Sequence, residues 1–172
     1  ASQCARMTAK INKRRRFDIS VHWFEGSEVG SVVGMKLPPG EWFLISQDRI
    51  NRFADCTEDF QFIHVDQSKA QETIFEGTIA HGFLTLSMLT KLCEGSSIAV
   101  QGIVMGLNYG FDKVRFLKPV TSGSRVRASS EVISASRKDS NRYLIKLAVT
   151  VEIEGSDTPA IYAEWLTMQL TD

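Results

Sequence analysis

The strongest constraint on the fold is the stretch His81-Gly82-Phe83-Leu84-Thr85-Leu86-Ser87-Met88-Leu89-Thr90-Lys91-Leu92-Cys93. Its apolar side chains point in almost every direction around a helix, and the first charged residue, Lys91, comes only near its end. A helix that is apolar on all sides must be buried on most of them. Residues 81–93 are therefore predicted to form a helix inside the core, and Gly95 is predicted to end it.

The chain after this helix is predicted to form a series of β-strands. Over residues 143–154 every second side chain is apolar, which is typical of a strand with one buried face. The predicted strands are residues 98–107, 114–119, 125–136, 143–154 and 161–170. Short polar segments such as Asn108-Tyr109-Gly110 separate them and indicate antiparallel neighbours. A buried helix followed by a long antiparallel sheet predicts an α+β fold in which the sheet curves around the helix.

Two further helices are predicted ahead of the buried one. Ser46 offers an N-cap for residues 47–56, where apolar residues recur at three- and four-residue spacing. One face of this helix should therefore be buried and the other exposed. Asp66 is predicted to cap a second, short helix near residues 67–73.

The N-terminal part of the chain gives weaker signals. Residues 42–45 are predicted to be a short strand, and residues 17–39 a wrapping extension with little regular structure, because glycines and prolines interrupt it. Residues 1–16 contain no acid and end in Lys13-Arg14-Arg15-Arg16, which fits a transit peptide, a basic arm or a disordered leader left in part from cloning. So short a basic run is typical of solvated chain, so a leader is predicted, followed by a single domain over 17–172.

The composition restricts the partners and the compartment. Lys plus Arg and Asp plus Glu each total 20, so no global charge attracts nucleic acid. The three cysteines include no CxxC spacing, which favours a reduced, cytoplasmic compartment, and Cys56 and Cys93 are predicted to be small buried hydrophobic residues. Three histidines leave little material for a metal site. No apolar stretch reaches the roughly 20 residues that span a bilayer, so a soluble protein without membrane insertion is predicted.

Two short motifs carry the candidate chemistry. Asp59 and His64 stand five residues apart, and Ala80-His81-Gly82 opens the buried helix. A histidine exchanges a proton near neutral pH, a carboxylate can share the same water, and the N–H of Gly82 can stabilise an oxyanion. By spacing alone, an Asp/His pair in a loop is more often a turn residue and a hydrogen-bonded histidine. His81 is predicted to have a structural role near the start of the helix.

These motifs resemble those of the MaoC-like (R)-specific enoyl-CoA hydratases and, within them, the nodulation protein N-like subgroup. The resemblance rests on residues 59–64, Ala80-His81-Gly82, residues 108–116 and Pro119-Val120, and it is firmest over residues 41–123. It implies a hot-dog fold, here as one unit because no internal repeat is visible, and a homodimer. It also implies reversible addition of water to a trans-2-enoyl-CoA to give an (R)-3-hydroxyacyl-CoA. The CoA thioester is then the substrate, and no cofactor or metal is expected.

The resemblance also assigns roles to individual residues. It implies that Asp59 and His64 hold one water and act as the acid–base pair, and that the Gly82 N–H binds the oxyanion. Thr90 aligns with a position where related enzymes carry a hydroxyl near the site. Arg115 could meet the CoA phosphates, although a charged residue on a strand usually belongs to the solvated face.

One departure from the family pattern affects specificity, and two other functions remain open. Many relatives read Asp-x-Asn-Pro-x-His, whereas Phe62 replaces the rigid proline here, so the acyl pocket is expected to differ in shape.

The first alternative to a hydratase is a hot-dog acyl-CoA thioesterase, but the Asp59/His64 pair argues against it. The second is a non-catalytic acyl-CoA-binding hot-dog protein. Carrier-protein dehydratases of fatty-acid synthesis are disfavoured, because their His-Phe-Pro and Pro-Gly signature is missing.

Overall fold

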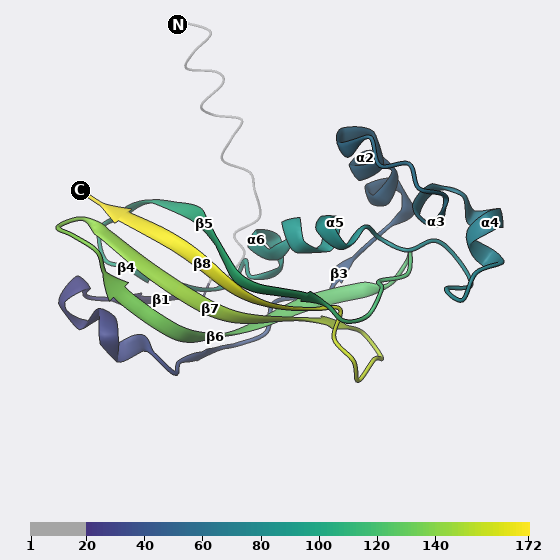
Figure 1. Cartoon of the computed structure of the whole chain (residues 1–172). Helices are drawn as coiled ribbons and strands as arrows, with labels where there is room; N and C mark the ends of the chain where they lie inside the picture. The colour runs from purple at the N-terminus through teal and green to yellow at the C-terminus, as the bar shows by residue number, and fades with distance from the viewer. Residues whose placement is uncertain (1–19) are drawn as a thin grey trace, which may run out of the picture.

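The computed structural model of the chain describes residues 20–172 (Figure 1). The leader predicted over residues 1–16 lies outside these residues. The first elements are β1 (Ser20–Phe24), the 3-10 helix η2 (Gly26–Val32), β2 (Lys36–Leu37), β3 (Phe43–Leu44), α2 (Gln47–Thr57), α3 (Phe62–Val65) and α4 (Gln67–Gln71). They are followed by α5 (Gly82–Ser87), α6 (Leu89–Leu92), β4 (Ser96–Val100), β5 (Ile103–Phe116), β6 (Arg125–Arg137), β7 (Arg142–Ile153) and β8 (Ile161–Thr171).

The main sheet is antiparallel and curved, with α5 and α6 against it and α2–α4 beyond its end (Figure 1). Its strand order is β2-β6-β7-β8-β5, and β3 also pairs with β6. The core contains Leu84, Leu89 and Leu92 from the helices and the alternate, buried residues of β7. This is the α+β hot-dog fold that was predicted, and the period-2 pattern over residues 143–154 is confirmed.

The central helix is present but divided. α5 ends at Ser87 and α6 begins at Leu89. Leu84 and Leu89 are buried, as predicted, whereas Phe83 is 68% exposed. The expectation of a helix buried on most sides is therefore wrong for its first turn, where the Phe83 ring meets the ring of Phe116 edge-on instead of entering the core. None of the helices within residues 20–172 is long and apolar enough to cross a membrane.

The predicted strands match β6, β7 and β8, but the two before them are wrong. The prediction over residues 98–107 runs across a turn at Gly102, whose φ of +77° is left-handed, so β4 ends at Val100. β5 then continues through Asn108-Tyr109-Gly110, which was expected to be a turn. The pairing of β5 with β8 shifts register between Asn108 and Gly110, so this segment is a β-bulge that keeps the strand direction.

The N-terminal extension is more regular than predicted. β1 pairs in parallel with β4, and β2 pairs antiparallel with β6. Phe24, Val32 and Leu37 are buried in the core. Local glycines and prolines suggested irregular chain, but hydrogen bonds to strands distant in the sequence order this segment.

Both predicted capped helices are confirmed. The Ser46 hydroxyl accepts a hydrogen bond from the Arg49 N–H at 3.3 Å at the start of α2. The Asp66 carboxylate accepts from the Lys69 N–H at 3.1 Å at the start of α4. These bonds satisfy backbone donors that have no partner within the helix. α4 ends at Gln71, two residues earlier than expected.

The two described cysteines differ in their surroundings. Cys93 is half-buried, and burial raises the pKa of its thiol to about 11. Cys56 is exposed, so the prediction that it is a buried hydrophobic residue is wrong. α2 buries the face that carries Ile50 and Ala54, and Cys56 points away from that face because successive residues turn by about 100°.

Candidate active site

Asp59 and His64 lie where the chain turns from α2 into α3. α2 ends at Thr57, and the left-handed φ of 58° at its C-cap residue Glu58 directs the chain away from the helix axis. Asp59 then carries a half-exposed side chain, whereas His64 on α3 is only 7% exposed. The Asp59 carboxylate accepts a weak hydrogen bond from the Gln61 N–H at 3.4 Å, which helps to shape the turn. The pair therefore combines an accessible carboxylate with a protected imidazole.

The hydrogen bond of His64 selects one tautomer of its ring. Nδ1 lies 2.8 Å from the carbonyl oxygen of Ile79, which can only accept, so Nδ1 carries a proton. In the neutral ring Nε2 therefore keeps its lone pair. Burial lowers the pKa of His64; the bond to Ile79 opposes this shift, and the charge of His81 adds to it. A neutral imidazole that can accept a proton at Nε2 is favoured at neutral pH.

The backbone of His64 is anchored by a partly buried polar network. The Gln47 side-chain amide donates to the His64 carbonyl oxygen at 2.7 Å. The same amide group accepts from the hydroxyl of Thr78 at 2.6 Å, and Thr78 is 2% exposed. Thr78 precedes Ile79, whose carbonyl holds the His64 ring. The network thus ties α2, α3 and the segment before α5 into one support for His64.

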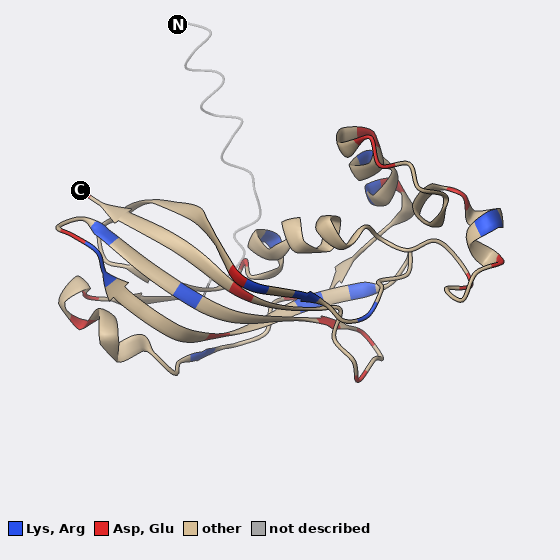
Figure 2. Cartoon of the chain, in the orientation of Figure 1, with Lys and Arg blue, Asp and Glu red and all other residues tan. Residues whose placement is uncertain are grey.

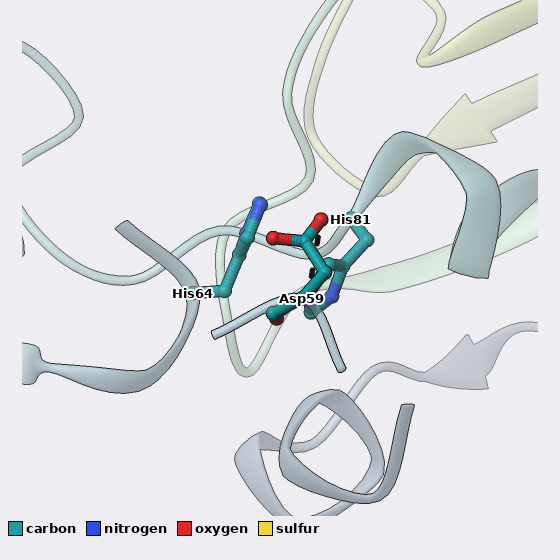
Figure 3. A group of neighbouring side chains, drawn as sticks. All are labelled: Asp59, His64 and His81. Carbon is teal, nitrogen blue, oxygen red and sulfur yellow. Dashed lines mark hydrogen bonds and ion pairs between the residues drawn. The ribbon is translucent and has the colours of Figure 1, made fainter. Parts of the chain in front are cut away.

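His81 completes a cluster with Asp59 and His64 (Figure 3). Its ring stacks on that of His64, with centroids 3.8 Å apart and planes at 26°. Nε2–H donates to the backbone carbonyl of Asp59 at 3.0 Å and lies 3.9 Å from the carboxylate of the same residue. The ring of Phe53 packs against it from α2 at 5.0 Å. His81 packs and bonds at the start of α5, as expected, but its partners are the two candidate catalytic residues.

The same three side chains are of types that bind divalent metals. Their ligand atoms all lie within 4.8 Å of one another. The two imidazole rings are nearly parallel, however, and an imidazole lone pair lies in the ring plane. Two such lone pairs run side by side. Tetrahedral coordination at about 2.0–2.1 Å requires lone pairs that converge on one ion. One nitrogen of each ring also serves a backbone carbonyl. The arrangement suits proton transfer better than metal coordination.

A cavity of about 220 Å³ lies beside His64. Gly82, Phe116 and Lys118 contribute to its walls. Gly82 is the first residue of α5, so its N–H has no partner within the helix. A Cβ atom at this position would lie 3.0 Å from the Phe116 ring, so a side chain here would crowd that ring. His64 and Gly82 therefore line the same cavity, which is the arrangement that a general base and an oxyanion donor require.

The structure adds polar residues to this cavity that the sequence reasoning missed, among them Thr85 and Lys118. Thr85 lines it one turn after Gly82 and is 2% exposed. It was treated only as part of the buried helix. The three-residue spacing from Gly82, which places both on one helix face, is the signal that could have found it.

Thr90 and Arg115 lie apart from the Asp59/His64/His81 cluster. Thr90 is exposed on α6 and lines a different cavity of about 570 Å³. Arg115 is exposed on β5, where its guanidinium donates to the Val114 carbonyl at 2.8 Å. It directly precedes Phe116, which lines the cavity beside His64. The described chain thus places His64 with Asp59 in one cluster and with Gly82 at one cavity, whereas Asp59, Arg115 and Thr90 are not among the residues that line that cavity.

Comparison with known proteins identifies the family. Residues 28–155 match the model of the MaoC like domain, and the chain belongs to this family. Nodulation protein N of Rhizobium leguminosarum bv. viciae is 42% identical over 149 residues, which cover 86% of this chain and 92% of that protein. The predicted resemblance to the MaoC-like family and its nodulation protein N-like members is therefore confirmed.

Two further relatives carry descriptions of activity. 3-hydroxyacyl-thioester dehydratase Z of Mycobacterium tuberculosis (strain ATCC 25618 / H37Rv) is 41% identical over 138 residues, covering 80% of this chain and 91% of that protein. Among solved structures, the (R)-hydratase from A. caviae involved in PHA biosynthesis has a TM-score of 0.62 and 26% identity. That similarity covers 78% of this chain and 94% of the other.

Proposed function

We propose that this protein is an (R)-specific enoyl-CoA hydratase, which in reverse is a 3-hydroxyacyl-CoA dehydratase. The observation that carries the proposal is the pairing of His64 and Asp59. The Nε2 lone pair of His64 is left free by the bond to Ile79, and the Asp59 carboxylate lies in the same cluster. The dehydratase and hydratase relatives named above support the same reaction class.

In hydration, the oxygen of one water forms a bond to C3 of the enoyl thioester. His64 Nε2 accepts the proton of that water, and the electron pair of the C2–C3 double bond moves toward the thioester carbonyl. The addition is completed when the Asp59/His64 pair returns one proton to C2, which leaves both groups in their starting protonation states. Dehydration follows the same steps in reverse. Positioned acid–base groups of this kind typically contribute about 10²–10⁴ in rate.

The thioester oxygen gains negative charge during this reaction, and Gly82 is the proposed donor to it. Its N–H is free of helical bonding and belongs to the cavity that His64 also lines. Lys118 lines the same cavity, and its positive charge can meet the phosphates of CoA; its described hydrogen bond goes to Ser156. Arg115 on β5 is the second cation proposed for these phosphates, and its described hydrogen bond goes to the Val114 carbonyl.

The proposed active form is a homodimer in which β5 meets β5 of a second copy. β5 is the edge strand of the main sheet. Val104, Met105 and Leu107 on it are each about half exposed, at 52%, 50% and 49%. Open strand edges and exposed apolar patches both favour association. Pairing this edge with itself would continue the sheet and cover the patch in a two-fold arrangement.

The proposed enzyme acts in the cytoplasm on a CoA thioester, without a metal, a cofactor or a nucleic-acid partner. The reaction needs no metal or cofactor, since the CoA thioester itself supplies the activated carbonyl. Acidic and basic residues are interspersed along the sheet (Figure 2) and total 20 each, which does not favour nucleic acid. A cytoplasmic location fits a protein with free cysteines at positions 56 and 93.

The deciding experiment mixes the purified protein with crotonyl-CoA and follows the enoyl absorbance, with the stereochemistry of the product determined. Loss of absorbance with formation of (R)-3-hydroxybutyryl-CoA supports the proposal. Release of free CoA and crotonate, without formation of 3-hydroxybutyryl-CoA, would identify a thioesterase. Saturable binding of crotonyl-CoA without either change would identify a non-catalytic acyl-CoA-binding protein.

A further inference from the structure

His81 contacts both candidate catalytic residues, and it does so by two different interactions. Its ring lies against the His64 ring at 3.8 Å between centroids. Its Nε2–H bonds to the Asp59 backbone at 3.0 Å, which fixes the turn that presents the carboxylate. His81 is itself immobile, because it is 3% exposed and packed against Phe53.

We propose that His81 is a positioning residue that sets the relative geometry of Asp59 and His64. The inference rests on the proposed function, because it concerns the same pair of side chains. It assigns no chemical step to His81. A displacement of about 1 Å in a catalytic group can cost about 10²-fold in rate, so a residue that fixes both partners affects turnover strongly.

The hydrogen bonding of His81 argues against a purely structural role. Nδ1 is buried and has no hydrogen-bond partner within residues 20–172. An unpaired buried polar atom opposes folding, and a phenyl ring would fill nearly the same space without one. The Asp59 carbonyl belongs to an exposed residue and could bond to water instead. Stability alone therefore favours an apolar ring at position 81, and function is the better reason for an imidazole.

The electrostatics of the cluster also connect His81 with the chemistry of His64. Burial is the main cause of the lowered pKa of His64, and the charge of His81 lowers it further, whereas Asp59 raises it. The charges that shift the His64 pKa come from His81 at the start of α5 and from Asp59 in the turn after α2, and Lys118 lines the cavity beside His64. Phe53, the contact from α2, carries no charge. Removing the imidazole at position 81 should therefore raise the His64 pKa.

Two substitutions separate the interactions of His81. His81→Phe keeps a ring against His64 and removes the donor to Asp59, whereas His81→Gln keeps a side-chain donor and removes the ring. His22→Phe is the matched control, because His22 is an exposed histidine on β1 outside the cluster. Each variant is measured in three ways: the midpoint of thermal unfolding, an NMR titration of the His64 imidazole, and kcat and KM on crotonyl-CoA.

For His81→Phe we expect a midpoint at or above that of the unchanged protein, together with a raised His64 pKa. We also expect kcat to fall about 10-fold or more while KM changes little, because geometry and not binding is lost. His81→Gln should also raise the His64 pKa and lower kcat. His22→Phe should match the unchanged protein in all three measurements.

The proposal is overturned if His81→Phe keeps both kcat and the His64 titration of the unchanged protein. It is also overturned if the only effect of both variants is a lower unfolding midpoint, with unchanged turnover per folded molecule. The NMR readout does not depend on turnover. An unchanged protein that is inactive on crotonyl-CoA but whose His64 pKa shifts in the variants would contradict the proposed function and leave the positioning role standing.

Discussion

The Nδ1–H of His64 donates to the carbonyl oxygen of Ile79 at 2.8 Å, although the two residues lie on separate segments. A carbonyl cannot donate, so this one bond fixes the tautomer and leaves Nε2 as the proton acceptor. Tautomer selection by a backbone carbonyl is a common way to orient a histidine. The first two predictions follow from this relationship.

Replacing either member of the proposed acid–base pair should abolish most activity without unfolding the protein. We expect Asp59→Asn and His64→Ala each to lower kcat on crotonyl-CoA by about 10²–10⁴. Circular dichroism should show a retained fold, and His22→Ala, an exposed change outside the cluster, should keep full activity. Near-full turnover by either variant would show that the assignment is wrong.

The lowered pKa of His64 predicts a pH dependence of activity. Burial disfavours the imidazolium, so Nε2 should stay unprotonated until the pH falls below the ordinary value of about 6.5. We expect kcat/KM for hydration to be flat near neutrality and to fall on the acid side with a midpoint below about 6.5. A midpoint above 7 in a pH–rate profile at constant ionic strength contradicts this reading.

The same shift predicts a pH dependence of stability. Because the folded-state pKa of His64 lies below its unfolded value, the unfolded chain binds more protons at acid pH. The free energy of unfolding should therefore decrease as the pH falls from about 6.5 through the lower, folded-state pKa. Urea unfolding at several pH values should show a smaller decrease in His64→Gln than in the unchanged protein. An equal decrease in both would assign the effect to other groups.

Gly82→Val should stop turnover while the oligomer persists. The added Cβ would lie 3.0 Å from the Phe116 ring and in the space proposed for the thioester. The φ of Gly82 is not among the positive values, so backbone strain is not expected and the effect should be steric. Crotonyl-CoA kinetics and light scattering test both halves of this expectation. A normal rate would show that the thioester carbonyl binds elsewhere.

The proposed dimer depends on the exposed apolar side chains of β5. Leu107→Glu would place a charge at the centre of the proposed contact, and we expect light scattering at micromolar concentration to show a shift toward monomer. Ile74→Glu is the control, because Ile74 is 92% exposed and lies on the segment after α4. A monomeric unchanged protein, or a Leu107→Glu variant that stays dimeric, counts against an interface at β5.

Some elements of this protein were determined by local sequence. Ser46 and Asp66 cap their helices through bonds to residues three positions on, so short-range chemistry was enough to predict α2 and α4. The alternation in β7 has one physical cause, the burial of one sheet face, and it could be read directly. Asp59, His64 and Gly82 were predicted from motif spacing together with the family resemblance, and the structure places His64 in one cluster with Asp59 and beside one cavity with Gly82.

Other features required the tertiary structure, because they depend on partners far away in the chain. β1 and β2 exist by pairing with β4 and β6, and β5 passes through a predicted turn because β8 holds it on both sides of a bulge. The tautomer of His64 and the contacts of His81 likewise come from other segments. Residue types and local spacing therefore set which groups can react. Long-range packing alone sets the protonation and the orientation of these groups, because these two properties depend on neighbours that the local sequence does not contain.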